Sequence, residues 1–201
     1  MKRLLLMLMS GAFAAQADTA TLGLRGGSAY VRGHPDRDRW AATAGLEGQW
    51  RHGWLVLGGA FDASSRVGNL TTGNVRHMFF SGEGGLSLDL ANRLRLDLIG
   101  EVGGHRLSGS RSGPFRVSDS ETTDVYLGSD PVWAPFVGAR PTFQLLFSQL
   151  AVGLSAWARA DLTPLDPPMF LDPAAFPFAA QHSSIGRVTA GADVLLAVRF
   201  Q

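Results

Sequence analysis

The stretch LRLDLIGEV, residues 94–102, alternates apolar and charged side chains. Because successive side chains of a β-strand point to opposite faces, this alternation predicts a strand with one apolar and one charged face. Arg95, Asp97 and Glu101 share the charged face with His105, and the intervening leucines hold the apolar face. A strand of this kind separates two different environments. The other segments of the chain indicate which environments these are.

The same alternation recurs along the chain and predicts an all-β protein, an up-and-down barrel of eight antiparallel strands. Most of the segments exceed the ~9–11 residues that a tilted strand needs to cross a bilayer. The expected strands are Thr19 to Val31, Trp40 to Trp50, Trp54 to Val67, His77 to Ala91, Leu94 to Gly109, Val132 to Phe147, Leu150 to Thr163 and Arg187 to Phe200.

Short and long connections alternate strictly between these strands. The short ones are expected at Arg51-His52-Gly53, Asn92-Arg93 and Ser148-Gln149, as tight hairpins require. The other four are longer, and the part ETTDVYLG, residues 121–128, is expected to extend a hairpin beyond the membrane. All short turns therefore fall at one end and all long loops at the other, which is typical of bacterial membrane barrels.

The charges within the strands share one face of each strand, and Arg106 is the exception, near the end of its strand. The acids and arginines of this face are nearly equal in number, which favours mutual pairing inside a barrel. The charged set also includes Arg66 and Arg187. The predicted network of the lumen comprises Arg25, Glu47, Asp62, Glu83, Asp89, Arg95, Asp97, Glu101, Arg140, Arg159, Asp161, Asp193 and Arg199.

Alternation alone also fits a soluble lipocalin-like barrel with its apolar face inward. The near balance of the charges favours the membrane alternative, in which these charges face the interior. Aromatic residues at strand ends favour it too, because aromatic girdles mark the two membrane interfaces. These residues are Tyr30, Trp40, Trp50, Trp133, Phe147 and Phe200.

The architecture resembles the small OmpA/OmpX-type outer-membrane barrels. The likeness covers the chain from residue 18 onward as an arrangement of eight strands, four long loops and a last strand that closes in Arg199-Phe200. In that family a terminal Phe belongs to the signal read by the barrel-assembly machinery. The resemblance places this role on Phe200, with Gln201 following it.

The first residues predict export. Lys2 and Arg3 precede an apolar run, and Ala15-Gln16-Ala17 supplies the small residues of a cleavage site, so residues 1–17 are expected to be a signal peptide and residues 18–201 the barrel. The apolar run is shorter than the ~20 residues of a spanning helix. There is no cysteine, and the small net charge gives no reason to expect nucleic acid as a partner.

Eight strands leave a lumen only wide enough for its own side chains, so a filled and salt-bridged interior is expected rather than an open pore. A narrow channel for small solutes stays as an alternative. Pro141 lies within a strand and removes a hydrogen-bond donor, and a β-bulge is the expected accommodation. No metal or cofactor is expected.

The enzymatic alternative rests on His182 and Ser184, which could form a general base and nucleophile at the outer end of the last strand. This H-x-S spacing resembles part of the outer-membrane lipid A deacylases and would make the protein a lipid A hydrolase. The preferred function is non-enzymatic, a structural or adhesive role of a barrel with four extracellular loops. The enzyme and channel hypotheses stay open at this point.

The expected surroundings are outer-membrane lipid and lipopolysaccharide, with the barrel-assembly machinery as a partner during biogenesis and a monomer as the final state. Four arginines near the outer rim could bind lipopolysaccharide phosphates through bidentate hydrogen bonds. They are Arg32, Arg37, Arg39 and Arg106.

Overall fold

The computed structural model describes residues 18–31, 40–65, 67–69, 73–116, 122–128, 131–163 and 188–200, and the side chains of 18–30, 40–65, 76–108, 131–163 and 188–200. No helix in these ranges is long and apolar enough to cross a membrane. The strands are β1 (Thr19–Val31), β2 (Trp40–His52), β3 (Leu55–Ser64), β4 (Val67–Asn69), β5 (Gly73–Ala91), β6 (Leu94–Arg116), β7 (Thr122–Gly128), β8 (Val132–Leu146), β9 (Leu150–Asp161) and β10 (Val188–Phe200).

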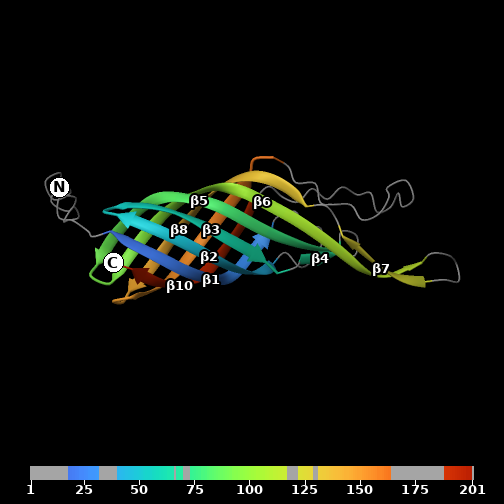
Figure 1. Cartoon of the computed structure of the whole chain (residues 1–201), viewed down its shortest axis with the longest axis horizontal. Helices are drawn as coiled ribbons and strands as arrows, with labels where there is room; N and C mark the ends of the chain where they lie inside the picture. The colour runs from blue at the N-terminus through green and yellow to red at the C-terminus, as the bar shows by residue number, and fades with distance from the viewer. Residues whose placement is uncertain are drawn as a thin grey trace.

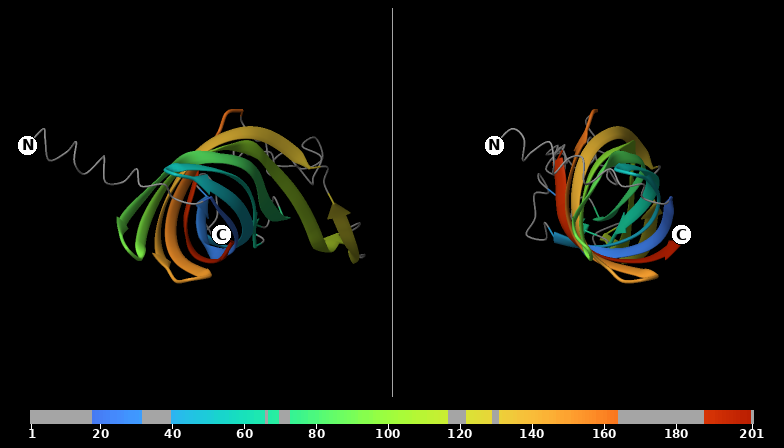
Figure 2. Two further views of the ribbon diagram at one scale, coloured as in Figure 1. Left: turned by 60° about the vertical axis from the view of Figure 1, so that its left-hand side comes forward. Right: turned by 90° about the vertical axis from the view of Figure 1, so that its left-hand side faces the viewer.

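Eight of these strands form a closed antiparallel barrel. The sheet runs β5-β3-β2-β1-β10-β9-β8-β6, and pairing between β5 and β6 closes it. The strands follow one another around a ring in Figure 2. Closure gives every strand of the barrel two neighbours, so the predicted eight-stranded all-β fold is confirmed.

The two short strands β4 and β7 lie outside this ring. β4 pairs with Gly73–Val75 of β5, and β7 pairs with Ser110–Arg116 of β6. The β6 and β7 hairpin projects beyond the barrel at one end (Figure 1). The predicted extension over residues 121–128 is therefore confirmed for Thr122–Gly128.

We call the two ends of the barrel the turn end and the loop end. The turn end holds three short connections, the start of β1 and the close of β10, where Ala20 pairs with Phe200. The first connection differs from the expectation, because β2 continues to His52 and the turn lies at Gly53-Trp54. Gly53 has a φ of 58°, a left-handed conformation that favours glycine. The turn is centred there, and Arg51 stays in the strand.

Pro141 does not produce the expected bulge. Its partner across β6 is Leu98, in continuous register, and the pairing with β9 resumes at Thr142 and Ser155 with no shift after Ala139 and Ala158. The ladder to β9 is interrupted at residues 140 and 141 instead, because proline has no N–H to donate. The described register shift lies between Asp89 and Ala91 of β5, beside a short turn.

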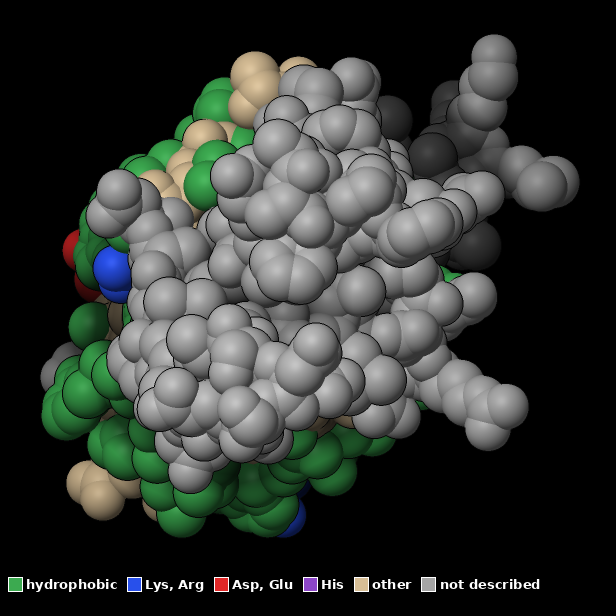
Figure 3. All heavy atoms as spheres, turned by 90° about the vertical axis from the view of Figure 1, so that its right-hand side faces the viewer, with side chains coloured by type: hydrophobic (Ala, Val, Ile, Leu, Met, Phe, Trp, Pro, Cys, Tyr) green, Lys and Arg blue, Asp and Glu red, His purple; other side chains and the backbone are tan. Residues whose placement is uncertain are grey.

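The barrel has its apolar side chains outside and its polar side chains inside. Leu24, Val102 and Leu154 are 59–65% exposed on the outer wall, whereas Arg140 and Arg159 inside are 1–2% exposed. A soluble lipocalin-like barrel would have the opposite arrangement. Figure 3 shows the outer wall as apolar side chains around the end that faces the viewer.

Aromatic side chains lie on the outer wall at both ends of the apolar band. At the loop end, the ring centroids of Tyr30 and Trp40 are 5.3 Å apart and those of Phe80 and Trp133 are 5.8 Å apart. At the turn end, exposed aromatic residues are Trp50, Trp54, Phe147 and Phe200. These two girdles match the aromatic belts by which membrane barrels meet the lipid headgroups.

Two neighbouring glycines of β1 differ in the space around them. A Cβ on Gly27 would collide with the Ala192 carbonyl oxygen and with Asp193 on β10, whereas a Cβ on Gly26 would meet nothing within 4 Å. We expect Gly27→Ala to lower the free energy of unfolding by about 1–3 kcal/mol and Gly26→Ala to change it little. Urea unfolding in lipid vesicles, followed by tryptophan fluorescence, measures both. Equal losses in the two variants would contradict this packing.

Candidate functional site in the barrel lumen

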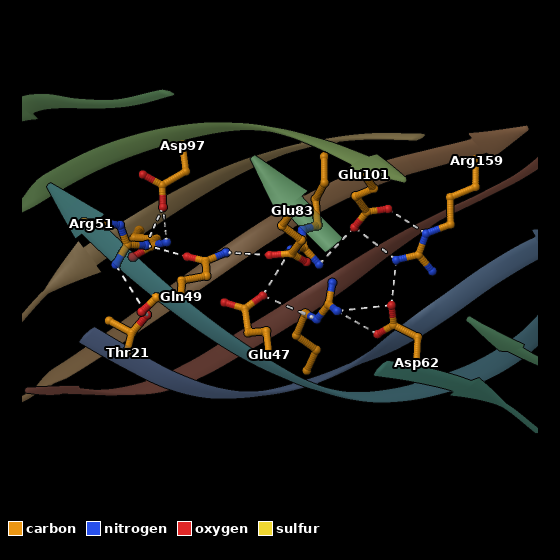
Figure 4. A network of polar contacts seen from close by, with 12 residues as sticks. Thr21, Glu47, Gln49, Arg51, Asp62, Glu83, Asp97, Glu101 and Arg159 are labelled. Atoms are coloured by element: carbon orange, nitrogen blue, oxygen red, sulfur yellow. Dashed lines mark hydrogen bonds and ion pairs between the residues drawn. The ribbon is translucent and has the colours of Figure 1, made fainter. Parts of the chain in front are cut away.

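The centre of the lumen holds a cluster of charged side chains contributed by seven of the eight barrel strands (Figure 4). All of its members are buried. They face inward because each lies on the inward parity of an alternating strand. The cluster, which we call the central cluster, consists of Arg25, Arg140, Arg159, Glu47, Asp62, Glu83 and Glu101.

Arg159 joins two acids of the central cluster from the loop-end side. Its Nε donates to Oε2 of Glu101 and its second terminal nitrogen to Oδ2 of Asp62, each over 2.6 Å. Each of these acids also pairs with a second guanidinium. Arg25 lies 3.0 Å from Asp62, and Arg140 lies 3.3 Å from Glu101. The charges therefore form a connected cluster rather than isolated pairs.

The other two acids complete the cluster. Glu47 lies between Arg25, at 3.5 Å, and Arg140, at 3.3 Å. Glu83 accepts a short hydrogen bond from Arg140 and a second one, over 3.1 Å, from Nε2 of Gln49. Each acid thus has at least one charge-assisted hydrogen bond or ion pair, which offsets the cost of its burial.

The polar contacts continue from Gln49 to the turn end, as Figure 4 shows. Arg51 donates to Oε1 of Gln49 over 2.8 Å and to Oδ2 of Asp97 over 2.6 Å. The same carboxylate oxygen accepts from Nε2 of Gln144 over 2.6 Å, and Arg51 also reaches the Thr21 hydroxyl at 3.4 Å. Polar side chains therefore fill the lumen over this half of the barrel.

Aromatic side chains pack on the loop-end side of the central cluster. The Arg159 guanidinium lies 4.7 Å from the ring centroid of Phe79, 4.6 Å from Trp157 and 5.4 Å from Phe136. The Phe79 ring stacks on His105 with centroids 4.2 Å apart. Arg159 is held between carboxylates on one side and ring faces on the other, and cation–π attraction adds to its fixation.

A chain of two histidines and one acid lies beside these rings. Nδ1 of His105 is 2.9 Å from Oδ2 of Asp161, and its Nε2 is 3.0 Å from Nδ1 of His77. When His105 is neutral and donates to the carboxylate, its Nε2 accepts from His77. The adjoining cavity, lined in part by Ser64 and Thr43, has a volume of about 10 Å³. That volume holds at most about one water.

Most of the residues that were predicted to form the lumen network lie inside the barrel. Eleven of the thirteen are buried, and among them Asp193 accepts from the Thr43 hydroxyl over 3.0 Å. Asp89 and Arg199 instead lie at the turn-end mouth and are partly exposed. They were expected in the network because parity alone does not say how deep along the strand a residue lies.

Several residues of the filled lumen were missed by the sequence analysis. Arg51 was placed in a turn, and the uncharged residues of the inward face were not considered. Most of these residues occupy the same alternate positions of their strands as the inward-facing charged residues, and this signal in the sequence could have identified them. The missed residues are Thr21, Gln49, Arg51, His77, Phe79, Phe136, Gln144 and Trp157.

The remaining predicted sites were expected at the outer rim. Outside the described residues lie His182, Ser184, Arg32, Arg37 and Arg39, together with Gln201 and the predicted signal peptide, residues 1–17. Arg106, the exception to the predicted charge pattern, lies on the outer wall, 5.9 Å from the Trp133 ring centroid. Among the described residues, no group of three or more metal-ligating side chains could hold a metal ion.

The fold of the whole chain is similar to that of solved membrane barrels. Neisserial surface protein A matches with a TM-score of 0.55 at 8% identity, over 92% of this chain and 97% of that one. The fold is that of a small outer-membrane β-barrel. The barrel also resembles Ail, the attachment invasion locus protein of Yersinia pestis, with a TM-score of 0.50 at 12% identity, over 91% and 97% of the two chains.

A second structure of Ail, in complex with the heparin analogue sucrose octasulfate, matches this barrel with a TM-score of 0.50 at 10% identity, over 91% of this chain and 97% of that one. No protein-family model matches the chain, and no curated protein matches it. At these identities the likeness concerns the fold alone.

Two acids of the barrel allow a matched test of the central cluster. Glu101→Gln would leave Arg159 and Arg140 short of a buried partner, and we expect it to lower the free energy of unfolding by about 3–5 kcal/mol. Asp89→Asn removes a mouth pair with Arg95 and should cost about 0–1 kcal/mol. Urea titration of the folded barrel measures both. A loss for Glu101→Gln no larger than that for Asp89→Asn would show that the cluster does not stabilise the barrel.

Proposed function

We propose that this protein is a non-enzymatic outer-membrane protein, which spans the membrane as a sealed barrel and presents its loop end for contact with partners. The observation that carries the proposal is the central cluster. Seven strands contribute charged side chains to it, and these pair across the lumen. A lumen filled in this way supports a rigid scaffold and leaves no continuous path for solutes.

The outer wall supports the membrane location. Its leucines and valines form an apolar band between two aromatic girdles, and the barrel strands have 10–23 residues. A tilted strand needs about 9–11 residues to cross a bilayer. In the orientation usual for such barrels, the turn end faces the periplasm and the loop end faces outward.

The loop end supports a role in contacts with partners. The pairing of β6 with β8 ends at Leu107 and Val132, whereas β5 and β6 stay paired to Asn74 and Ser110. From Ser110 onward β6 pairs with β7. A sheet therefore rises beyond the ring of the barrel, and rigid barrels commonly carry function on such projecting elements.

The two alternatives have less support. The deacylase hypothesis depends on His182 and Ser184, which the structure does not describe, and none of the contacts reported above concerns them. The channel hypothesis requires a path that the central cluster occupies. We therefore propose the sealed, interaction-presenting barrel ahead of both.

Conductance tests the seal. We expect the purified protein, inserted in a planar bilayer, to give no discrete conductance steps, because ion pairs occupy the centre of the lumen. A general porin in the same bilayer is the positive control. Heat-dependent gel mobility of the same preparation shows that the barrel is folded. Reproducible conductance steps from folded protein would overturn the sealed barrel.

Lipopolysaccharide contact at the loop end is a part of the proposal that Arg106 can test. Its guanidinium lies on the outer wall beside Trp133 in the loop-end girdle, where a phosphate could reach it. We expect lipopolysaccharide to raise the melting temperature of the wild type in nanodiscs, and Arg106→Gln to reduce this increase. The same variant in phosphatidylcholine nanodiscs is the control for its own stability. An unchanged increase would contradict the contact.

A further inference from the structure

The mouth of the barrel at the turn end opens into a vestibule of about 780 Å³. This end faces the viewer in the right-hand panel of Figure 2. The vestibule is lined by Arg93, Arg95 and Arg199, with Asp89 as the one carboxylate of the lining, and by Leu146 and Phe147. Its volume lies within the range of about 300–1,000 Å³ that is usual for small-molecule sites.

The charges of this vestibule are unbalanced, unlike those of the central cluster. Asp89 accepts from Nε of Arg95 over 2.7 Å, so its charge is already engaged there. A terminal nitrogen of Arg199 donates a hydrogen bond to the carbonyl oxygen of Phe147 over 3.0 Å. This carbonyl is a neutral acceptor. The lining therefore contains one carboxylate and three guanidiniums, which is an excess of positive charge.

The donors of the vestibule also exceed its acceptors. Nε of Arg199 and one terminal nitrogen of Arg95 are shielded from solvent, and no described residue accepts a hydrogen bond from either atom. An anion in the vestibule would reduce the excess of positive charge that these guanidiniums create.

Buried side chains lie deeper in the lumen, beyond the vestibule. Leu146 packs in a buried apolar cluster with Ala151, Leu195 and Ala197. On the other side of the lumen, Arg51 is paired with Asp97. A ligand that enters from the turn end therefore stops at the arginines, so the vestibule has the form of a binding site rather than the entrance of a channel.

We propose that the vestibule binds a phosphate group presented from the turn-end side of the membrane. Planar guanidiniums bind phosphate oxygens through paired, charge-assisted hydrogen bonds, and three of them line this one cavity. The phosphate can belong to a soluble anion or to the headgroup of a lipid in the adjacent leaflet. The inference depends on the barrel fold and goes beyond the sealed-barrel function.

The test uses the folded, isotope-labelled protein and two sources of phosphate. In zwitterionic micelles, inorganic phosphate is titrated and amide chemical shifts are followed. In nanodiscs, phosphatidylcholine is compared with a mixture that contains phosphatidylglycerol. We expect saturable shifts at residues 89–95 and 146–149. A response to inorganic phosphate identifies a soluble ligand, and a response to phosphatidylglycerol alone identifies a lipid headgroup.

Two variants and one control make the result specific. Arg199→Gln and Arg93→Gln should each weaken binding by about tenfold or more, because each removes charged donors from the site. Arg76→Gln, an exposed arginine of β5 towards the loop end, should bind as the wild type does. Heat-dependent gel mobility shows that each variant is folded. Absence of saturable shifts with both probes, or equal binding by wild type and Arg199→Gln, would overturn the proposal.

Discussion

Closure of the sheet is the constraint on which the rest of this structure depends. A backbone in hydrocarbon must satisfy its hydrogen bonds within the protein, and a strand does so only when it has a neighbour on each side. Pairing of β1 with β10 and of β5 with β6 removes both edges of the sheet. Closure with eight strands fixes a narrow interior, which must then be filled by the side chains themselves. The fold thereby determines that the inward residues are packed against one another, and for this reason we propose a function at the ends or on the outer wall.

A narrow and filled interior also determines what kind of charges it can contain. Arg140 and Arg159 are almost without contact with solvent, so each needs carboxylates within the barrel. Because β-strands alternate faces, these carboxylates come from other strands, and Glu101 of β6 thus contacts arginines of β8 and β9. The pair with Arg140 joins neighbouring strands, whereas the pair with Arg159 connects β6 to β9, which are not neighbours in the sheet. The cluster therefore adds cross-links of specific geometry to a wall whose main-chain ladders only join adjacent strands.

The sequence was sufficient to predict the outer wall and many of the residues in the lumen. Both follow from the alternation of side chains between the two faces of a strand. The strand from Leu94 and the closing strand to Phe200 were predicted with the correct faces. The bounds of the closing strand were nearly correct, whereas the strand from Leu94 continues to Arg116 instead of ending at Gly109. The wrong predictions concern features that the alternation of side chains along a strand does not determine. The turn after β2 depends on the left-handed conformation of Gly53, so Arg51 was misplaced. The ladder beside Pro141 is interrupted without a bulge. The depth of Asp89 and Arg199 depends on the stagger of the strands, and the contacts of His77, Phe79 and Gln49 depend on packing across the lumen.

In the sealed barrel that we propose, the charges along the lumen axis would oppose the passage of ions of either sign. The turn-end mouth presents three arginines and one carboxylate, whereas the central cluster contains four carboxylates and three arginines. A cation that approaches from the turn end meets the excess of arginines first and is repelled. An anion is attracted to those arginines, and it then meets carboxylates that are already engaged and repel it. The arrangement that would block transport in the proposed barrel is therefore the same one that makes the mouth suited to hold an anion. A sealed scaffold and a phosphate-binding vestibule are compatible properties of one charge distribution.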